Sequence, residues 1–537
     1  MTRRRKHMAT KRGFYIGEMF ERAAARHGAV RVTLDRVLDV APGAGLEHTY
    51  VTLAELVGEL AARLSAAGVR RADRVAVYKS DNVDLALLTC ALSRIGAVPA
   101  LLSPSLTPGV VAKLLQRMDR PWLISDPAKL TGELAPSELP ALTRDVMLVG
   151  AGAKVQAERI AGIALETLAG APRQPAVRLD PREPALITHS SGTTGLPKLA
   201  VHCPQALRNR LLPQQVMGWP SRGETAALCM SYVHSRFYHA LGVFLGYGSP
   251  LVLMVDHDPA LVGPLLARTR PGIVETHPNT FVLWEELAAA PGGPLANVGF
   301  YGSTFDAIHP RTIQRLLGAS RRPAAVLTQL YGQSETGPVV ARFFTRKGAA
   351  KANGRLVGIG LPGFTRVRVV DDNGRRVRAG VPGHIEARTR GRILTYLGGE
   401  EQYTKQLSGG WWRMGDVGYR TRWGGLYLTD REIDQIDAVD SNLELEDILM
   451  SRLEELREIV IVPGLDGGAV PVVCTRNDQP LDPQRWRDAV AGLPALAEPV
   501  VCRFEDLPRT GTWKIKRVEI AELLRESQSL SRNWIAS

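Results

Sequence analysis

The residues from 188 to 198 combine hydroxyls, glycines and a lysine in the pattern of a phosphate-binding loop. They read Thr-His-Ser-Ser-Gly-Thr-Thr-Gly-Leu-Pro-Lys and follow the apolar run 185–187, which predicts that the loop leaves the end of a strand. Hydroxyls and glycine N–H groups can surround phosphate oxygens, and Lys198 adds a mobile cation. The order Gly-x-x-Gly-x-x-Lys differs from a Walker loop, which needs four residues between its glycines. The loop therefore predicts a polyphosphate site of another class.

Four later segments carry polar residues that one nucleotide site could use: 331–336 (Tyr-Gly-Gln-Ser-Glu-Thr), 412–418 (Trp-Arg-Met-Gly-Asp-Val-Gly), 428–431 (Leu-Thr-Asp-Arg) and 507–517, around Lys514. Taken singly, each has an ordinary explanation. Asp416 could be a turn residue, Glu335 an acid at a helix N-terminus, and Lys514 one basic residue among many. Their order and spacing behind the phosphate loop favour a shared function.

Together with the loop Ser-Gly-Thr-Thr-Gly-x-Pro-Lys, these segments resemble the motifs of the adenylate-forming superfamily, which includes acyl-CoA synthetases, peptide-synthetase adenylation domains and firefly-type luciferases. The resemblance spans essentially the whole chain. It implies that an acid oxygen attacks the α-phosphorus of ATP, expels pyrophosphate and leaves an acid–AMP anhydride. Such chemistry depends on positioning and charge neutralisation, because two anions must meet at phosphorus.

The resemblance implies a role for each motif residue. Asp416 would accept hydrogen bonds from the ribose hydroxyls, Arg431 would reach ribose or phosphate, and Glu335 would bind Mg²⁺, which prefers carboxylate oxygens. In this family a C-terminal lysine touches both the acid and the α-phosphate, and Lys514 is in that position. The resemblance implies His234 and Lys198 as further catalytic residues. The expected nucleotide-binding residues are Ser190, Ser191, Gly192, Thr193, Thr194, Gly195, Lys198, Gly302, Ser303, Tyr331, Gly332, Gln333, Ser334, Asp416, Arg431 and Lys514.

The acid pocket is expected around His234, which falls where family members place a residue between the acid and the α-phosphate. A structural histidine is an equally weighted alternative. The expected substrate contacts are His234, Arg236, Tyr238, His239 and Tyr301. Where relatives have Gly-Gly-Ala or a similar small triplet, this chain has the bulkier Ser303-Thr304. A short or flat pocket for a small, compact or aromatic acid follows, rather than one for a long fatty acid.

The chain departs from the family mainly near its C-terminal end. Ile433 replaces the usual Asp or Lys hinge residue, Asp440 stands where a glycine lines the thiol tunnel, and Trp513 replaces the glycine before the catalytic lysine. In the family the small domain rotates after adenylation to admit a thiol. The pattern therefore supports activation of an acid more strongly than thioester formation.

Three functions remain open. The first is a ligase that transfers a small carboxylic acid from AMP to CoA or a carrier-protein thiol. In the second, the adenylate meets a non-thiol acceptor such as an amine, as in amide ligases and in diazo-forming relatives that activate nitrite. The third is a catalytically silent relative, against which the intact Lys198, Glu335, Asp416 and Lys514 weigh.

The elements that position these residues belong to an α/β fold. Short apolar runs alternate with amphipathic stretches over residues 73–126 and again over 185–330, which predicts two α/β lobes with parallel sheets. After Gly360 short strands and turns predict an antiparallel β subdomain. We expect a basic arm (1–12), a large AMP-binding domain (13–430) and a small, mobile α+β domain (431–537).

Composition is that of a globular protein: 537 residues, 45% hydrophobic, with 67 basic and 54 acidic side chains and a net charge of +13. Basic residues alternate with acidic ones outside the arm, so we expect no nucleic-acid partner. No apolar run approaches the roughly 20 residues of a membrane span, and no secretory signal is visible. Five scattered cysteines predict reduced thiols and no zinc site. A cytoplasmic enzyme without a membrane partner is expected.

Overall fold

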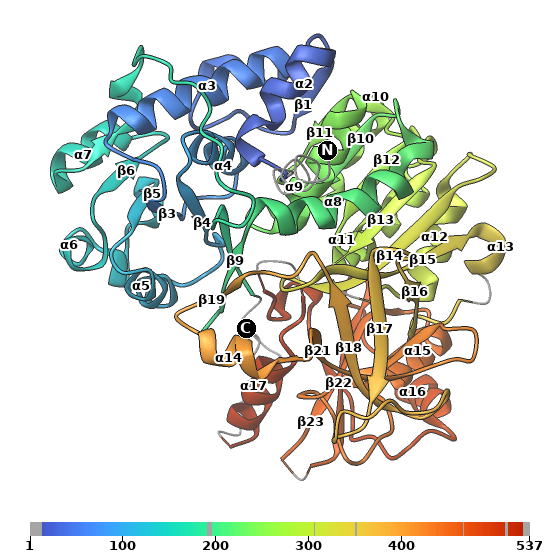
Figure 1. The fold of residues 1–537 in the computed structure, drawn as a ribbon. Helices are drawn as coiled ribbons and strands as arrows, with labels where there is room; N and C mark the ends of the chain where they lie inside the picture. Colours follow the sequence, from blue (N-terminus) through green and yellow to red (C-terminus); the bar gives the residue numbers. More distant parts are fainter. Residues whose placement is uncertain are drawn as a thin grey trace, which may run out of the picture.

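The computed structural model of the chain describes residues 13–190, 196–304, 307–349, 352–465, 467–510 and 514–529 (Figure 1). Two large sheets and one small sheet form its framework. The helices of the large part are α2 (Met19–His27), α3 (Tyr50–Ala66), α4 (Asp84–Arg94), α5 (Pro108–Arg117), α6 (Leu139–Leu142), α7 (Ala153–Ile160), α8 (Pro204–Gly218), α9 (Ser235–Tyr247), α10 (Pro259–Thr269), α11 (Pro278–Leu283), α12 (Pro310–Ala319), α13 (Arg346–Ala349) and α14 (Glu400–Lys405). No helix among the described residues is long and apolar enough to cross a bilayer.

The first lobe is an eight-stranded sheet with a parallel centre. In spatial order its strands are β19 (Thr395–Leu397), β9 (Leu199–His202), β8 (Leu186–His189), β4 (Val98–Leu101), β3 (Arg74–Val77), β5 (Trp122–Ser125), β6 (Val146–Leu148) and β7 (Ile163–Ala164). Alternate residues of β3 enter different cores: Val75 packs in the cluster that includes α4, and Ala76 in the cluster that includes α5. The predicted parallel sheet with helices on both faces is confirmed.

The second lobe continues without a break into the β subdomain. Its strands lie in the order β17 (Thr365–Val370), β18 (Gly383–Thr389), β21 (Trp411–Arg420), β22 (Leu426–Arg431), β16 (Leu356–Gly360), β15 (Gly337–Thr345), β14 (Val326–Gln333), β13 (Phe300–Thr304), β12 (Ile273–Thr276), β10 (Ala226–Cys229), β11 (Leu251–Leu253), β1 (Arg31–Leu34) and β2 (Glu47–Thr49), and β20 (Leu407–Ser408) pairs with β21. Pairing is parallel from β1 to β14 and antiparallel from β14 to β17. The predicted antiparallel region thus extends the parallel sheet.

The region beyond β22 forms the small α+β unit. It contains the strands β23 (Leu456–Pro463), β24 (Ala469–Thr475) and β25 (Val500–Val501) and the helices α15 (Asn442–Arg452), α16 (Pro483–Val490) and α17 (Arg517–Ser529). The apolar residues from Leu445 to Leu456 do not all belong to one helix, because α15 ends at Arg452. Leu453 already has extended backbone angles and Leu456 begins β23, although both still pack in the core cluster that contains Leu449.

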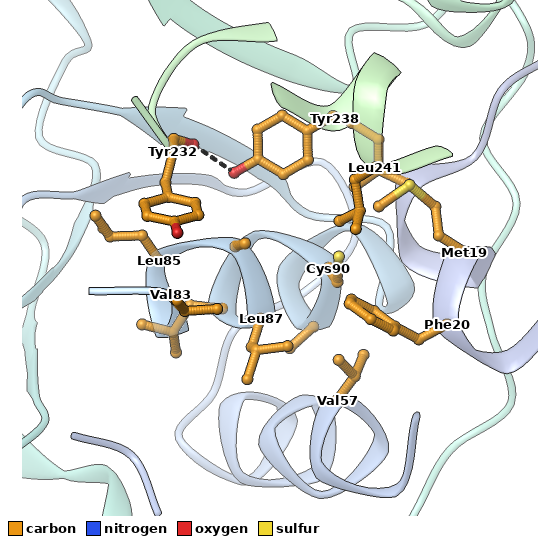
Figure 2. Close-up of a cluster of buried hydrophobic side chains, with 14 of the residues drawn as sticks. Met19, Phe20, Val57, Val83, Leu85, Leu87, Cys90, Tyr232, Tyr238 and Leu241 are labelled. Atoms are coloured by element: carbon orange, nitrogen blue, oxygen red, sulfur yellow. Dashed lines mark hydrogen bonds between the residues drawn. The ribbon is translucent and has the colours of Figure 1, made fainter. Parts of the chain in front are cut away.

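Helix α9 lies between the first and second lobes and is fixed by a buried cluster (Figure 2). Tyr238 and Leu241 of α9 pack with Phe20 of α2 and Val57 of α3. The Tyr238 hydroxyl donates a hydrogen bond of 2.9 Å to the carbonyl oxygen of Tyr232. The N-terminal turn of α9, which carries His234 and Arg236, is therefore attached to a rigid support.

Candidate active site

The phosphate loop connects the antiparallel strands β8 and β9 as a hairpin. At its base the Ser190 N–H donates to the Lys198 carbonyl at 2.9 Å, and the Lys198 N–H donates to Ser190 Oγ at 3.0 Å. The Lys198 ammonium lies 5.3 Å from the centre of the Tyr396 ring. The remaining predicted phosphate contacts, Ser191, Gly192, Thr193, Thr194 and Gly195, lie outside the described residues. Both ends of the loop are thus fixed by backbone pairing.

Tyr396 links the loop to the predicted magnesium ligand. It belongs to β19, which pairs with β9, and its hydroxyl donates to Glu335 Oε1 at 2.6 Å. Among the described residues no other side-chain hydrogen bond reaches this carboxylate, so Oε2 remains for a metal. A single carboxylate sharing the ion with phosphate oxygens and waters suits Mg²⁺. Sequence reasoning missed Tyr396, because its pairing with β9 is a contact between segments far apart in the chain.

Arg210, on α8, is a second residue that the sequence did not reveal. Its buried guanidinium donates to the carbonyl oxygens of Ser334 and Glu335, both at 2.9 Å, and of Gly391 at 2.6 Å. Burial lowers the pKa of Arg210 to about 10, so the side chain remains charged at neutral pH. It ties the turn that carries Ser334 and Glu335 to the helix behind it.

The predicted nucleoside residues meet where β14, β21 and β22 approach one another. The Tyr331 hydroxyl donates to Asp416 Oδ2 at 2.5 Å, and Asp416 is opposite Arg431 in the β21–β22 register. Burial raises the pKa of Asp416, and the Arg431 guanidinium acts in the opposite direction. Gln333 donates to the carbonyl of Met414 and accepts from Trp412 at 3.2 Å. Gly332 has no room for a side chain, since a Cβ there would lie 2.1 Å from the Gly337 oxygen.

A cavity lies beside these residues and is lined both by the large part of the chain and by Lys514 of the small α+β unit. His234, Ser334 and Lys514 all line it. Lys514 comes from the small domain, and its positive charge is near enough to lower the pKa of His234 and of Asp416. The lysine predicted to catalyse the first step is therefore close to the residues predicted to hold the nucleotide and the acid.

His234 precedes α9 and caps it. Its Nδ1 accepts a hydrogen bond of 3.1 Å from the Arg236 N–H, and its Nε2 lies 3.1 Å from Ser334 Oγ. Burial, with the nearby charges of Arg210 and Lys514, lowers the pKa of His234 well below its ordinary value. The ring is therefore neutral at physiological pH, and because Nδ1 accepts, the proton is on Nε2. His234 presents a hydrogen-bond donor to the cavity, not a base.

The residues that follow His234 on α9 face two different sides of the helix. Arg236 and His239 are three residues apart, face the same side of α9 and both line the cavity. The His239 ring nitrogens lie 2.6 and 3.1 Å from the carbonyl oxygens of Ser235 and Leu207. Tyr238 faces the opposite side and is buried in the core of Figure 2. Tyr238 therefore does not line the cavity, and the expectation that it contacts the substrate is wrong.

The strand period makes a similar separation in β13. Thr304 lines the cavity, and Gly302 faces the Glu275 side chain, to which an added Cβ would approach within 2.9 Å. Tyr301 and Ser303 point to the opposite face because side chains alternate along a strand. Tyr301 is packed with Phe281 in another core cluster. The expectation that Tyr301 contacts the substrate is therefore wrong. Ser303 is fully buried and does not line the cavity either.

Comparison with known proteins gives consistent results. The family model described as AMP-binding enzyme matches residues 20–397. The 3-amino-2-hydroxy-4-methoxybenzoate diazotase of Streptomyces cremeus is 55% identical over 530 residues, which cover 96% of each chain. The 4-chlorobenzoate–CoA ligase of Arthrobacter sp is 26% identical over 517 residues, covering 90% of this chain and 91% of the relative.

A solved structure has the same fold over nearly the whole chain. The crystal structure of ATP-bound MatB from Rhodopseudomonas palustris superposes with a TM-score of 0.78 at 19% sequence identity, covering 96% of this chain and 100% of that chain. The family model matches well over half of the chain. The motif residues 332–334 and 514 line one cavity, and the neighbouring motif residue Tyr331 is hydrogen-bonded to Asp416. The chain belongs to the AMP-binding enzyme family and is an adenylate-forming enzyme, which uses ATP and Mg²⁺.

Proposed function

We propose that this enzyme adenylates nitrite and transfers the nitroso group to an aryl amine, which makes it a diazotase. The observation that carries the proposal is the 55% identity, over 96% of both chains, to a protein named for diazotising an aminobenzoate. The C-terminal departures at Ile433 and Asp440 also support it, because a reaction without a thiol needs no thiol tunnel.

The reaction has two steps. An oxygen of nitrite attacks the α-phosphorus of ATP, the bond to the bridging oxygen breaks, and pyrophosphate leaves. The amine nitrogen then attacks the nitrite nitrogen, the N–O bond to AMP breaks, and the amine loses one proton to water. The products are AMP and an N-nitroso aryl amine. Tautomerisation, addition of a proton and loss of water convert the latter to an aryl diazonium ion.

The cavity residues suit the first step. Lys514 would neutralise charge as the nitrite oxygen approaches phosphorus, and the Nε2–H of His234 would donate to an anionic oxygen. Glu335, with one oxygen bonded to Tyr396, would hold Mg²⁺, which neutralises phosphate charge when bound. Lys198 and the phosphate loop would hold the departing pyrophosphate.

A carboxylic acid transferred to CoA or a carrier-protein thiol is the second candidate. The specific observation in its favour is the 26% identity to 4-chlorobenzoate–CoA ligase over 90% of the chain. In that function CoA would be the acceptor, and the carboxylate rather than nitrite would meet the α-phosphorus.

Pyrophosphate release separates the candidates. The enzyme with ATP and Mg²⁺ is given nitrite or a panel of benzoates, each with and without an aryl amine or CoA. We expect nitrite-dependent pyrophosphate release, AMP rather than ADP, and a diazonium product trapped by azo coupling when the amine is present. CoA-dependent turnover of a benzoate without nitrite would select the second candidate. No pyrophosphate release with any acid would indicate a silent relative.

A further inference from the structure

Arg236 is an arginine at the edge of the cavity whose guanidinium is held from two sides. It forms an ion pair with Glu275 of β12 and donates a hydrogen bond to Gln214 of α8. The side chains of Arg236 and Glu275 are only 11% and 3% exposed. A buried, braced guanidinium presents a fixed plane of donors, and that geometry suits two-point binding of a carboxylate.

Arg236 retains donors for a ligand. A guanidinium carries five N–H groups, and the interactions with Glu275 and Gln214 use one each. The Nε–H is buried and has no acceptor among the described residues. Arg210, the neighbouring arginine, has its donors directed instead to main-chain oxygens and to Ser235.

The cavity carries an excess of positive charge. Arg210, Arg236 and Lys514 line it, and none of its described lining residues is an aspartate or glutamate. Burial lowers the pKa of His234 and of His239, so these rings add no charge at neutral pH. Three positive charges line the cavity, and the carboxylate of Glu275 balances one of them. Two positive charges therefore remain for ligand anions. One adenylate phosphate accounts for a single charge, and a second anion would balance the other.

The cavity also offers a hydrogen-bonding partner for a polar substituent on the ring of an aromatic ligand. Thr304 Oγ1 lines the same cavity, is buried, and has no hydrogen-bond partner among the described residues. A buried hydroxyl without a partner is costly unless a ligand or water satisfies it. The cavity thus offers an anion-binding side chain and a hydroxyl together.

We infer that Arg236 binds the carboxylate of the amine substrate, so the acceptor is an aminobenzoate whose carboxylate is recognised and never activated. The inference rests on the proposed function. Glu275 and Gln214 act as positioning residues that fix the guanidinium plane, and Lys514, which lines the same cavity, serves the adenylate.

Binding measured by calorimetry tests the inference independently of turnover. The probes are 3-aminobenzoate and its neutral analogue 3-aminobenzamide, titrated into the full chain with AMP and Mg²⁺. We expect the wild type to bind the benzoate about 10- to 100-fold more tightly, as for a charged hydrogen bond. The variant Arg236→Gln/Glu275→Gln removes both charges without leaving one unpaired, and should bind the two probes within about threefold of each other.

Two further variants make the result specific. Arg236→Lys keeps the charge but loses the planar fork, and should recover only part of the preference. Arg71→Gln/Glu183→Gln removes an exposed ion pair elsewhere and should keep the full preference. In turnover with nitrite, the loss in Arg236→Gln/Glu275→Gln should fall on the KM for the benzoate.

Several results would overturn the inference. One is that the wild type binds 3-aminobenzoate and 3-aminobenzamide equally well. Another is that Arg236→Gln/Glu275→Gln still prefers 3-aminobenzoate. Should this variant fail to fold, the wild-type comparison decides alone. Pyrophosphate release driven by 3-aminobenzoate without nitrite would also overturn it, because the carboxylate would then meet phosphorus. If nitrite drives no pyrophosphate release although the benzoate preference is present, the proposed function fails and the binding subsite stands.

Discussion

Lys514 is the only described residue of the small domain in the cavity lining; every other lining residue belongs to the large domain. Its backbone is fixed by Thr510, since the Lys514 N–H donates to Thr510 Oγ1 at 3.2 Å and the Lys514 carbonyl accepts from the Thr510 N–H at 2.8 Å. A cation placed in advance near a developing charge stabilises the transition state without reorganisation. We therefore propose that Lys514 carries most of the catalysis of the first step.

The variant Lys514→Ala should lose adenylation but retain nucleotide binding. Removing one preorganised group of this kind costs about 10²- to 10³-fold in rate. Pyrophosphate exchange measures the rate, and calorimetry with ATP measures binding. Lys516→Ala is the matched control, because Lys516 pairs with Glu519 on α17. Near-normal exchange in Lys514→Ala would refute the assignment.

Asp430, at the end of β22, makes stability depend on pH. Its Oδ2 accepts from the Asn442 N–H at 3.0 Å, and burial raises its pKa to about 7. The folded protein therefore keeps a proton that the unfolded chain releases near pH 4. This contribution to stability is full below about pH 4 and is lost as the pH rises through 7.

Asp430→Asn keeps an acceptor for Asn442 without the charge. We expect it to be more stable than the wild type at pH 8, by about 2 to 4 kcal/mol, with a much smaller difference at pH 5. Denaturant unfolding at both pH values measures this. Asp437→Asn, at an exposed position in the same connection, is the control. An equal difference at both pH values would contradict the linkage.

At the scale of elements, the pairing of β9 with β19 places Tyr396 between two functional groups. Its ring lies under the Lys198 ammonium and its hydroxyl bonds to Glu335. Partners of this kind orient a ligating side chain, and their loss typically costs about 10- to 100-fold in metal affinity or activity. We therefore propose Tyr396 as a positioning residue for Glu335, the expected magnesium ligand.

Tyr396→Phe should raise the Mg²⁺ concentration needed for half-maximal pyrophosphate exchange about tenfold or more. The ring remains beneath Lys198, so the variant isolates the hydroxyl. Tyr419→Phe, which changes a tyrosine stacked on Tyr427 in the β subdomain, should match the wild type. An unchanged Mg²⁺ dependence in Tyr396→Phe would remove the residue from the site.

Local pattern predicted the elements better than it predicted the contacts between them. The strands near residues 75, 98 and 122 and the loop before Lys198 were predictable, because hydrophobic periodicity and turn residues are local signals. Tyr238 was wrongly expected in the acid pocket because it follows His234 closely in sequence. The helical period turns its side chain to the other side of α9. Glu275 and Arg210 carry no local signal, since their roles arise from partners on other elements.

At the scale of the molecule, α12 and the segment before it connect the two domains. His309 lies 3.3 Å from Asp447 Oδ1 and 3.1 Å from Glu458 Oε1, and Arg311 donates to the carbonyl oxygen of Met450 at 3.2 Å. Burial opposes the charged form of His309, but Glu458 and Asp447 together raise its pKa well above the ordinary value, so the ring is charged at neutral pH. These contacts hold the small domain where Lys514 reaches the cavity.

His309→Gln should weaken this docking. The charged pair stabilises the docked state fully below about pH 6.5, and that stabilisation is lost as the pH rises through the raised pKa of His309. We expect a several-fold slower adenylation step and faster proteolysis near residues 432–441 at pH 7. His48→Gln, in β2, is the control. Unchanged proteolysis would indicate that other contacts suffice.

The most direct test follows an oxygen atom. Wild-type enzyme is incubated with ATP, Mg²⁺, ¹⁸O-labelled nitrite and 3-aminobenzoate, and the AMP is analysed by mass spectrometry. Adenylation of nitrite followed by attack of the amine on nitrogen leaves one labelled oxygen on the phosphorus of AMP. Unlabelled AMP formed together with the diazonium product, or ADP in place of AMP, would contradict the mechanism.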